Sequence, residues 1–278
     1  MNRKFFRDKE TALKLKSENP IYSGMLSFYK RILDIREDYI DRLQKTLTPV
    51  AVSDNILITK IKEGFPLIDI QNLQVDYSLM NRYFLKLLFI VDSLAEKDME
   101  KLTALAAEEN VFKAAIQKTL RGEKHADYPA ALTFFLMETI HPVLEVHASS
   151  VKDRPELKDW TFGYCPICGN PPMIGILKGE EGKKYLVCGS CNSTWSFPRI
   201  KCHNCRTEDP VHLSYLRPEE NSRHRIEICD NCRTYLKVID LRPTSQDIDA
   251  DIENLVTLHL DIIARKKGYT HQNFFMMD

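Results

Sequence analysis

Apolar residues in the first 150 positions recur at the spacing of an amphipathic helix. The clearest stretch runs from Tyr22 to about Gln44, with Pro20 before it and Pro49 after it. The apolar residues that fall largely on one face of this stretch are Met25, Leu26, Tyr29, Ile32, Leu33, Ile40 and Leu43. A helix with such a stripe buries it against neighbouring elements, so the pattern predicts the beginning of a helical domain.

Three further helices are predicted by the same periodicity, over Ser78 to Leu94, Met99 to Leu120 and Pro129 to about His147. Gly122 is a stop signal for the second of them. Pro142 lies inside the third and is expected to kink or split it, because proline lacks the backbone N–H that a helix interior needs.

Two stretches of this half lack helical spacing. Val50 to Val75, which contains Gly64 and Pro66, is predicted to be a long ordered loop. Ser149 to Asp159 is polar and is the best candidate for a linker. We therefore expect an all-helical domain over residues 1–152.

Short apolar runs separated by polar turns replace the helical spacing after residue 160. Strands are predicted over Met173 to Leu177 and over His212 to Leu216. Each is followed by a polar hairpin tip, Lys178 to Lys183 or Pro218 to Arg225, and then by a returning strand.

All eight cysteines of the 278-residue chain lie in this region, in four Cys-x-x-Cys pairs. The pairs are Cys165/Cys168, Cys188/Cys191, Cys202/Cys205 and Cys229/Cys232. Such a turn directs two sulfurs toward one point, so two turns together supply a tetrahedron of soft ligands for zinc or iron. A closed four-sulfur shell has no open position for a hydrolytic water, so it favours a structural or electron-holding metal.

Residues 185–197 and 227–238 match in their Cys-x-x-Cys pair, an aromatic residue and apolar flanks, so the region is an internal repeat. We predict an α+β fold: an N-terminal all-helical domain, two tandem rubredoxin-like or zinc-ribbon four-cysteine metal domains over 160–198 and 199–242, and a C-terminal helix and tail over 243–278. The repeat favours one metal on the first two pairs and one on the last two. An interleaved cross-brace is the alternative.

The C-terminal helix is predicted after Pro243, with Ser245 as its cap. Acidic residues crowd its start and basic residues its end: Asp247, Asp249, Asp251, Glu253, Arg265, Lys266 and Lys267, followed by Gly268. These charges complement the helix dipole, which explains the acidic cluster better than a metal site does.

Composition restricts the function. Lys plus Arg and Asp plus Glu number 39 each, and residues 160–240 contain eleven basic and nine acidic residues, so a nucleic-acid partner is not expected. The N-terminus lacks a signal-peptide core, and no apolar run has the ~20 residues that cross a bilayer. We therefore expect a cytoplasmic protein without membrane insertion, where disulfides are disfavoured. The repeated spacing also disfavours thiol redox pairs.

Histidines give no catalytic set. His203 lies within a cysteine pair, but four cysteines already complete that shell, and His125, His141 and His147 are interpreted as ordinary surface or partly buried groups. No phosphate-binding loop, paired carboxylates or nucleophile elbow is present. The sequence thus predicts two metal ions, iron or zinc, and no enzyme activity.

Residues 160–172 (WTFGYCPICGNPP) and 188–205 (CGSCNSTWSFPRIKCHNC) resemble the formate dehydrogenase accessory protein FdhE family. The likeness continues through CDNCRTYLK at residues 229–237 to TLHLDIIARKKGY at 257–269, and more weakly to GFPLI at 64–68. It implies a maturation factor that binds the catalytic subunit of a molybdenum- or tungsten-dependent formate dehydrogenase, with rubredoxin-type iron on the eight cysteines. Only the first cysteine pair has the proline of the Cys-Pro-x-Cys pattern.

The leading interpretation is therefore a non-enzymatic accessory protein whose client binds in the groove between the helical half and the metal ribbons. A rubredoxin-type iron protein that transfers electrons to the same or another enzyme is the alternative. A zinc-ribbon nucleic-acid module is a third, disfavoured by the balanced charge.

Overall fold

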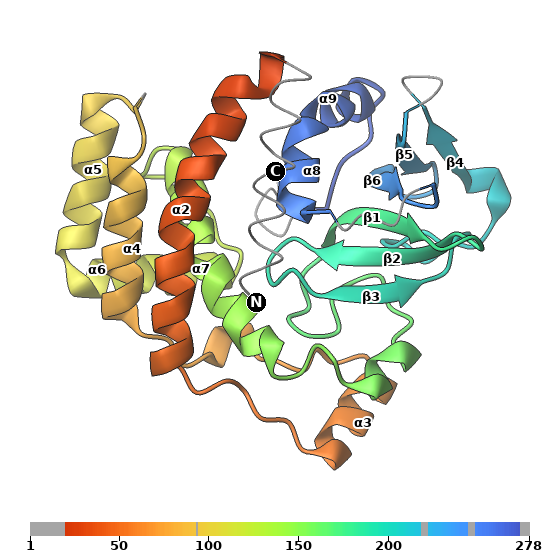
Figure 1. Ribbon diagram of the computed structural model, residues 1–278, viewed down its shortest axis with the longest axis horizontal. Coiled ribbons are helices and arrows are strands. Elements are labelled where there is room, and N and C mark those ends of the chain that lie inside the picture. The colour runs from red at the N-terminus through yellow and green to blue at the C-terminus, as the bar shows by residue number, and fades with distance from the viewer. Residues whose placement is uncertain (1–19, 93, 218–221, 244–247, 273–278) are drawn as a thin grey trace.

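The computed structural model describes residues 20–92, 94–217, 222–243 and 248–272. The helices of the first half are α2 (Ser23–Thr46), α3 (Asp54–Glu63), α4 (Tyr77–Phe89), α5 (Glu96–Ala107), α6 (Glu109–Leu120) and α7 (Ala131–Ser149). Short 3-10 turns are η1 (Pro20–Tyr22), η2 (Ile70–Asn72) and η3 (Pro155–Asp159). Helix α2 packs on α4 and α7, and α5 and α6 complete this layer (Figure 1). The predicted helical half is confirmed.

Three details of that prediction are corrected. The expected loop over Val50 to Val75 contains α3, in which Leu57 and Ile61 are buried while Ile56 and Ile58 are exposed, so its apolar residues do not form a single face. The expected helix from Met99 to Leu120 is two helices, because Glu108 has an extended backbone (φ −103°, ψ 101°). Pro142 does not split α7. That helix is buried on nearly all sides, so packing holds it together across the missing hydrogen bond.

The described strands form a six-stranded sheet in the order β3-β2-β1-β6-β5-β4. The strands are β1 (Pro172–Lys178), β2 (Lys183–Cys188), β3 (Thr194–Phe197), β4 (Leu213–Leu216), β5 (His224–Cys229) and β6 (Thr234–Asp240). A 3-10 turn, η4 (Pro210–His212), precedes β4, so the strand predicted from His212 begins one residue later. Neighbours are antiparallel except β1 and β6, which pair in parallel. That parallel pair fuses the two repeats into one sheet.

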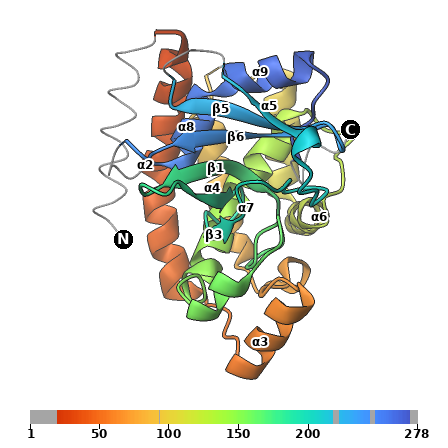
Figure 2. The same cartoon turned by 90° about the vertical axis from the view of Figure 1, so that its right-hand side faces the viewer.

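Two helices follow the sheet, α8 (Ala250–Val256) and α9 (Leu258–Lys266), where one helix was expected. The helical conformation is interrupted at Thr257. The hydroxyl of this residue donates a hydrogen bond to the Glu253 carbonyl at 2.6 Å. The predicted cap Ser245 and Asp247 lie outside the described residues, and Asp249 accepts from the Ile252 N–H as the cap of α8. Figure 2 shows β5, β6 and β1 side by side, with α8 and α9 behind them.

The main core is shared between the halves. It includes residues of α2 to α7 together with Leu177, Leu186 and Trp195 of the sheet. Among the described residues, no helix has the length and apolar character needed to cross a lipid bilayer.

One buried arginine joins three separate parts of the chain. Arg36 of α2 is 3% exposed and pairs with Glu145 of α7 at 3.1 Å and with Asp251 of α8 at 3.6 Å. The amide of Asn192, next to Cys191, donates to the same Glu145 carboxylate. The acidic start of α8 therefore contacts a cation as well as complementing the helix dipole.

We expect Arg36→Met to lower the free energy of unfolding by roughly 3 kcal/mol, because it leaves two half-buried carboxylates without their buried cation while keeping the side-chain volume. Arg42→Met, on the same helix, removes an exposed i,i+4 pair with Asp38 and should cost less than ~1 kcal/mol. Urea unfolding of the metal-loaded proteins measures both. Equal stability of the two variants would contradict the buried-pair interpretation.

Candidate metal centres

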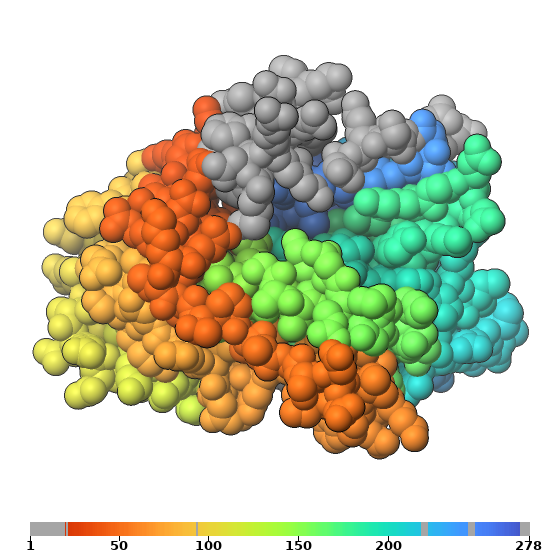
Figure 3. All heavy atoms as spheres, turned by 60° about the horizontal axis from the view of Figure 1, so that its bottom comes forward, coloured from red at the N-terminus to blue at the C-terminus, as the bar shows by residue number. Residues whose placement is uncertain are grey.

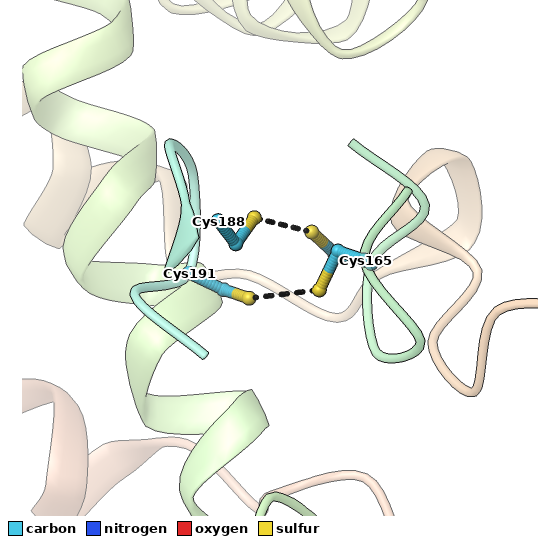
Figure 4. A group of neighbouring side chains, drawn as sticks. Cys165, Cys188 and Cys191 are labelled. Atoms are coloured by element: carbon cyan, nitrogen blue, oxygen red, sulfur yellow. Dashed lines mark hydrogen bonds between the residues drawn. The ribbon is translucent and has the colours of Figure 1, made fainter. Parts of the chain in front are cut away.

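The first two cysteine pairs meet in one four-sulfur set. The sulfurs of Cys165 and Cys191 are 3.6 Å apart, and those of Cys168 and Cys188 are 3.4 Å apart. Figure 4 shows Cys188 and Cys191 facing Cys165 across the space between the two turns. All four sulfurs lie within 4.8 Å of one another and belong to buried residues.

The last two pairs form a second set of the same kind. The Cys202–Cys232 and Cys205–Cys229 sulfur distances are both 3.6 Å, again with all four sulfurs within 4.8 Å. The sets therefore combine neighbouring pairs, as the repeat predicted, and the interleaved cross-brace is wrong.

The sulfur spacing matches a metal tetrahedron. Four sulfurs about 2.3 Å from one ion lie about 3.8 Å from each other, whereas a disulfide needs about 2.05 Å. All eight cysteines are free thiols in this geometry. Each set thus has the ligand number, type and spacing to hold one metal ion, and the geometry does not distinguish zinc from iron.

The backbone of each turn explains how two sulfurs converge. Backbone N–H groups point at sulfur in three turns, from Ile167 to Cys165 (3.4 Å), from Ser190 to Cys188 (3.3 Å) and from Asn204 to Cys202 (3.4 Å). These bonds favour the thiolate form that a metal binds. The residue after each second cysteine has positive φ: Gly169 (80°), Asn192 (54°), Arg206 (64°) and Arg233 (57°). Glycine and asparagine adopt positive φ readily, so they predict such a turn from the sequence. The two arginines do not.

In each set, hydrogen bonds lower the pKa of one cysteine. Burial acts to raise the pKa of Cys191, but hydrogen bonds with the other three sulfurs and Ser193 outweigh it and hold that pKa well below the ordinary thiol value. Burial likewise opposes ionisation of Cys205, but hydrogen bonds, first from the Asn231 amide, lower its pKa to about 6. In each set one cysteine therefore has a lowered pKa, and a lower pKa favours the deprotonated form that binds a metal.

A segment of the helical half supports the first set. The Leu67 and Ile68 N–H groups donate to the carbonyls of Pro166 and Ile167, at 2.9 and 2.8 Å. Lys60 donates in turn to the Pro66 and Leu67 carbonyls, at 2.9 and 3.0 Å. Figure 3 shows the neighbouring α3 (orange) beside the green segment that contains η3, which it contacts.

The periodicity of apolar residues did not predict this contact between Leu67–Ile68 and the first set. The contact depends on backbone groups of a segment that was interpreted as a loop. The sequence signal was Gly64-Phe-Pro-Leu-Ile itself, whose glycine has φ +78° and whose carbonyl accepts from Tyr164 Oη at 2.6 Å.

The histidines do not join either sulfur set within the described residues. His125 bonds Thr119 Oγ1, and His147 bonds the Gln74 carbonyl. His141 is half-buried on α7, and desolvation lowers its pKa to about 4. His203 lies between the second set and Gly163. A Cβ added at Gly163 would be only 1.7 Å from the backbone carbonyl oxygen of His203. Gly163 therefore lets the first ribbon approach the backbone of the second.

Two sequence-family models match the chain: "FdhE, central domain" over residues 164–199 and "FdhE, C-terminal domain" over residues 200–277. The "Protein FdhE homolog" of Aquifex aeolicus (strain VF5) is 27% identical over 272 residues, 95% of this chain and 93% of that protein. "Protein FdhE" of Escherichia coli (strain SMS-3-5 / SECEC) is 28% identical over 237 residues, which cover 78% and 72% of the two chains. The crystal structure of the FdhE protein from Pseudomonas aeruginosa matches with a TM-score of 0.67 and 25% identity, covering 98% of this chain and 94% of that chain.

Gly163→Ala should reduce the free energy of unfolding by more than the ~1–3 kcal/mol usual for overpacking, because the obstructing atom is backbone and cannot rotate away. Gly24→Ala is the control. It lies in α2 with nothing within 4 Å of an added Cβ, and should raise stability by up to ~1 kcal/mol. Denaturant unfolding measures the difference; two variants of equal stability would show that the ribbons do not contact at Gly163.

A chelator should remove metal from metal-loaded protein in two phases, the second set first, because Cys205 and Cys232 are partly exposed while the first set is wholly buried. Release is followed with a colorimetric indicator. Cys205→Ser should lose the fast phase and keep the slow one, and Cys168→Ser provides the reverse comparison. Survival of the fast phase in Cys205→Ser would refute this order.

Proposed function

Because the chain belongs to the FdhE family, we propose that it is a formate dehydrogenase accessory protein that binds the catalytic subunit of a molybdenum- or tungsten-dependent enzyme during maturation. The observation that carries this proposal is the combination of both FdhE domain matches with structural likeness along nearly the whole chain. The protein acts by binding and does not itself oxidise formate. The chemistry of the described residues agrees, because their candidate metal sets consist of thiols alone.

Two metal ions complete the proposal, one on each four-cysteine set. The ligands are Cys165, Cys168, Cys188 and Cys191 for the first, and Cys202, Cys205, Cys229 and Cys232 for the second. A reducing compartment keeps eight such thiols available, so we place the protein in the cytoplasm. Metal bound by the first set stabilises the shared core, since binding free energy at a site formed on folding is folding free energy.

A rubredoxin-type electron-transfer protein is the second candidate. The observation that favours it is the partial exposure of Cys205 and Cys232, which brings two sulfurs of one set close to solvent. Iron there would supply a one-electron couple tuned by hydrogen bonds such as Asn231 Nδ2 to Cys205 Sγ at 3.3 Å. Zinc would exclude that role.

The expected result of affinity capture with metal-loaded protein, from cells that produce a formate dehydrogenase, is recovery of its catalytic subunit. Cys168→Ser bait, with the buried set broken, is the control and should recover much less. If the wild-type bait captures no formate dehydrogenase subunit, the proposal is contradicted. Anaerobic metal analysis of the same protein separates the candidates, since two zinc ions in a colourless protein eliminate electron transfer.

A further inference from the structure

A pocket of about 520 Å³ lies against the second four-cysteine set. We call it the ribbon pocket. Its walls come from β4, β5, the starts of β2 and β6 and the segment between the ribbons, and they include Lys184, Arg199, Ile200, Tyr215, Arg225 and Glu227. Strand β4 lies at the opposite side of the molecule from α5 and α6 (Figure 1). The pocket is therefore remote from most of the helical half.

Cations in the ribbon pocket outnumber the carboxylates. Lys184 and Arg225 share a single carboxylate, that of Glu227, and their side chains are only 2% and 11% exposed. The triad by itself therefore has one net positive charge. Arg199 adds an exposed cation without a described ion pair, whereas Lys201 is paired with Glu208 at 3.0 Å.

The neighbouring thiolates do not bind these cations directly. A divalent ion with four thiolates has a formal charge of minus two, which lowers the positive potential of the pocket. The described partners of these sulfurs include the Asn204 N–H and the Asn231 amide, which donate to Cys202 and Cys205, and the Thr234 hydroxyl, which lies 3.0 Å from Cys232 Sγ. Two polar atoms at the pocket, His203 Nε2 and Arg225 Nε, are buried and have no hydrogen-bond partner among the described residues.

The mouth of the pocket is apolar. Ile200 and Tyr215, both in the pocket lining, are 63% and 55% exposed, although large apolar side chains are usually buried. The Tyr215 ring also packs against the Arg225 guanidinium, 5.2 Å from its centroid. Exposed apolar patches mark interaction sites, and tyrosine and arginine are enriched in protein–protein interfaces.

We propose that the ribbon pocket is the surface on which the client polypeptide docks, through a segment that has acidic side chains flanked by apolar ones. This rests on the proposed function and specifies its binding surface. The carboxylates of that segment face Arg199 and the Lys184–Glu227–Arg225 triad, and its apolar residues cover Ile200 and Tyr215. Docking there places the client beside the half-exposed second metal set.

A second pocket, of about 360 Å³, makes the natural comparison because it lies between the helical half and the first ribbon, where sequence analysis placed the client. It is lined by Ile58, Ile61, Lys62, Glu156, Asp159, Thr161 and Phe162. Its charged lining residues are Lys62, Asp159 and Glu156, and Glu156 is paired with Arg154 at 3.1 Å, so this pocket lacks the excess of cations that would attract an acidic segment. Ile58 and Lys62 are exposed and provide matched controls.

The test measures affinity of metal-loaded variants for a purified formate dehydrogenase catalytic subunit. Arg199→Glu and Ile200→Asp, both at exposed positions, should each weaken binding at least about tenfold, and Arg199→Glu should reduce its salt dependence. Lys62→Glu and Ile58→Asp make the same chemical changes at the other pocket and should bind within about twofold of wild type. Metal content is measured in every variant.

Each outcome decides one claim. Wild-type protein that binds no subunit refutes the proposed function itself. Wild-type binding that the ribbon-pocket variants retain, or that only the control variants lose, overturns the docking surface and leaves the function standing. Loss of metal from Arg199→Glu shows that the cations serve the metal centre instead, and also overturns it.

Photocrosslinking tests the chemistry of the segment. p-Benzoylphenylalanine in place of Tyr215, an exposed position, should crosslink to a client peptide rich in Asp and Glu. The same group in place of Phe65, 62% exposed near the other pocket, should give little crosslink. A Tyr215-position crosslink to a peptide without acidic residues overturns the proposal.

Discussion

The burial of the first four-cysteine set in the shared core is the constraint on which the rest of the fold depends. Its sulfurs are buried among the same apolar residues that join the helices to the sheet. Backbone hydrogen bonds from Leu67 and Ile68 to Pro166 and Ile167 fix that set to the helical half. Because metal binding at a buried thiolate site is coupled to folding, occupancy of this set affects the helices as well as the ribbon.

The parallel pairing of β1 with β6 gives the two repeats a common framework. Each repeat alone is a short antiparallel unit, and a unit of that size rarely has enough apolar surface to be stable without further support. Pairing Gly175 with Val238 extends the sheet across both, while α8 and α9 cover one of its faces. Contact of α8 with Arg36 then ties this sheet back to α2.

The two sulfur sets differ in environment although their sequences are similar. The first lies inside the main core, whereas the second has two half-buried cysteines beside a pocket rimmed by exposed apolar residues. A buried set suits a structural role, since a metal bound there would be shielded from exchange. A half-exposed set next to a cationic pocket suits contact with another molecule.

The sequence by itself determined the local features: helices with long apolar stripes such as α2, the four Cys-x-x-Cys turns, their grouping by repeat and the α+β class. These depend on spacing over a few residues, which the chain displays directly. Residues distant in sequence decided the rest. The division at Glu108, the helix α3, the Arg36 link, the Leu67 and Ile68 contacts and the fusion of two ribbons through β1 and β6 arise only where separate segments meet. Backbone hydrogen bonds and buried ion pairs leave no periodic signal, so only the tertiary structure reveals them.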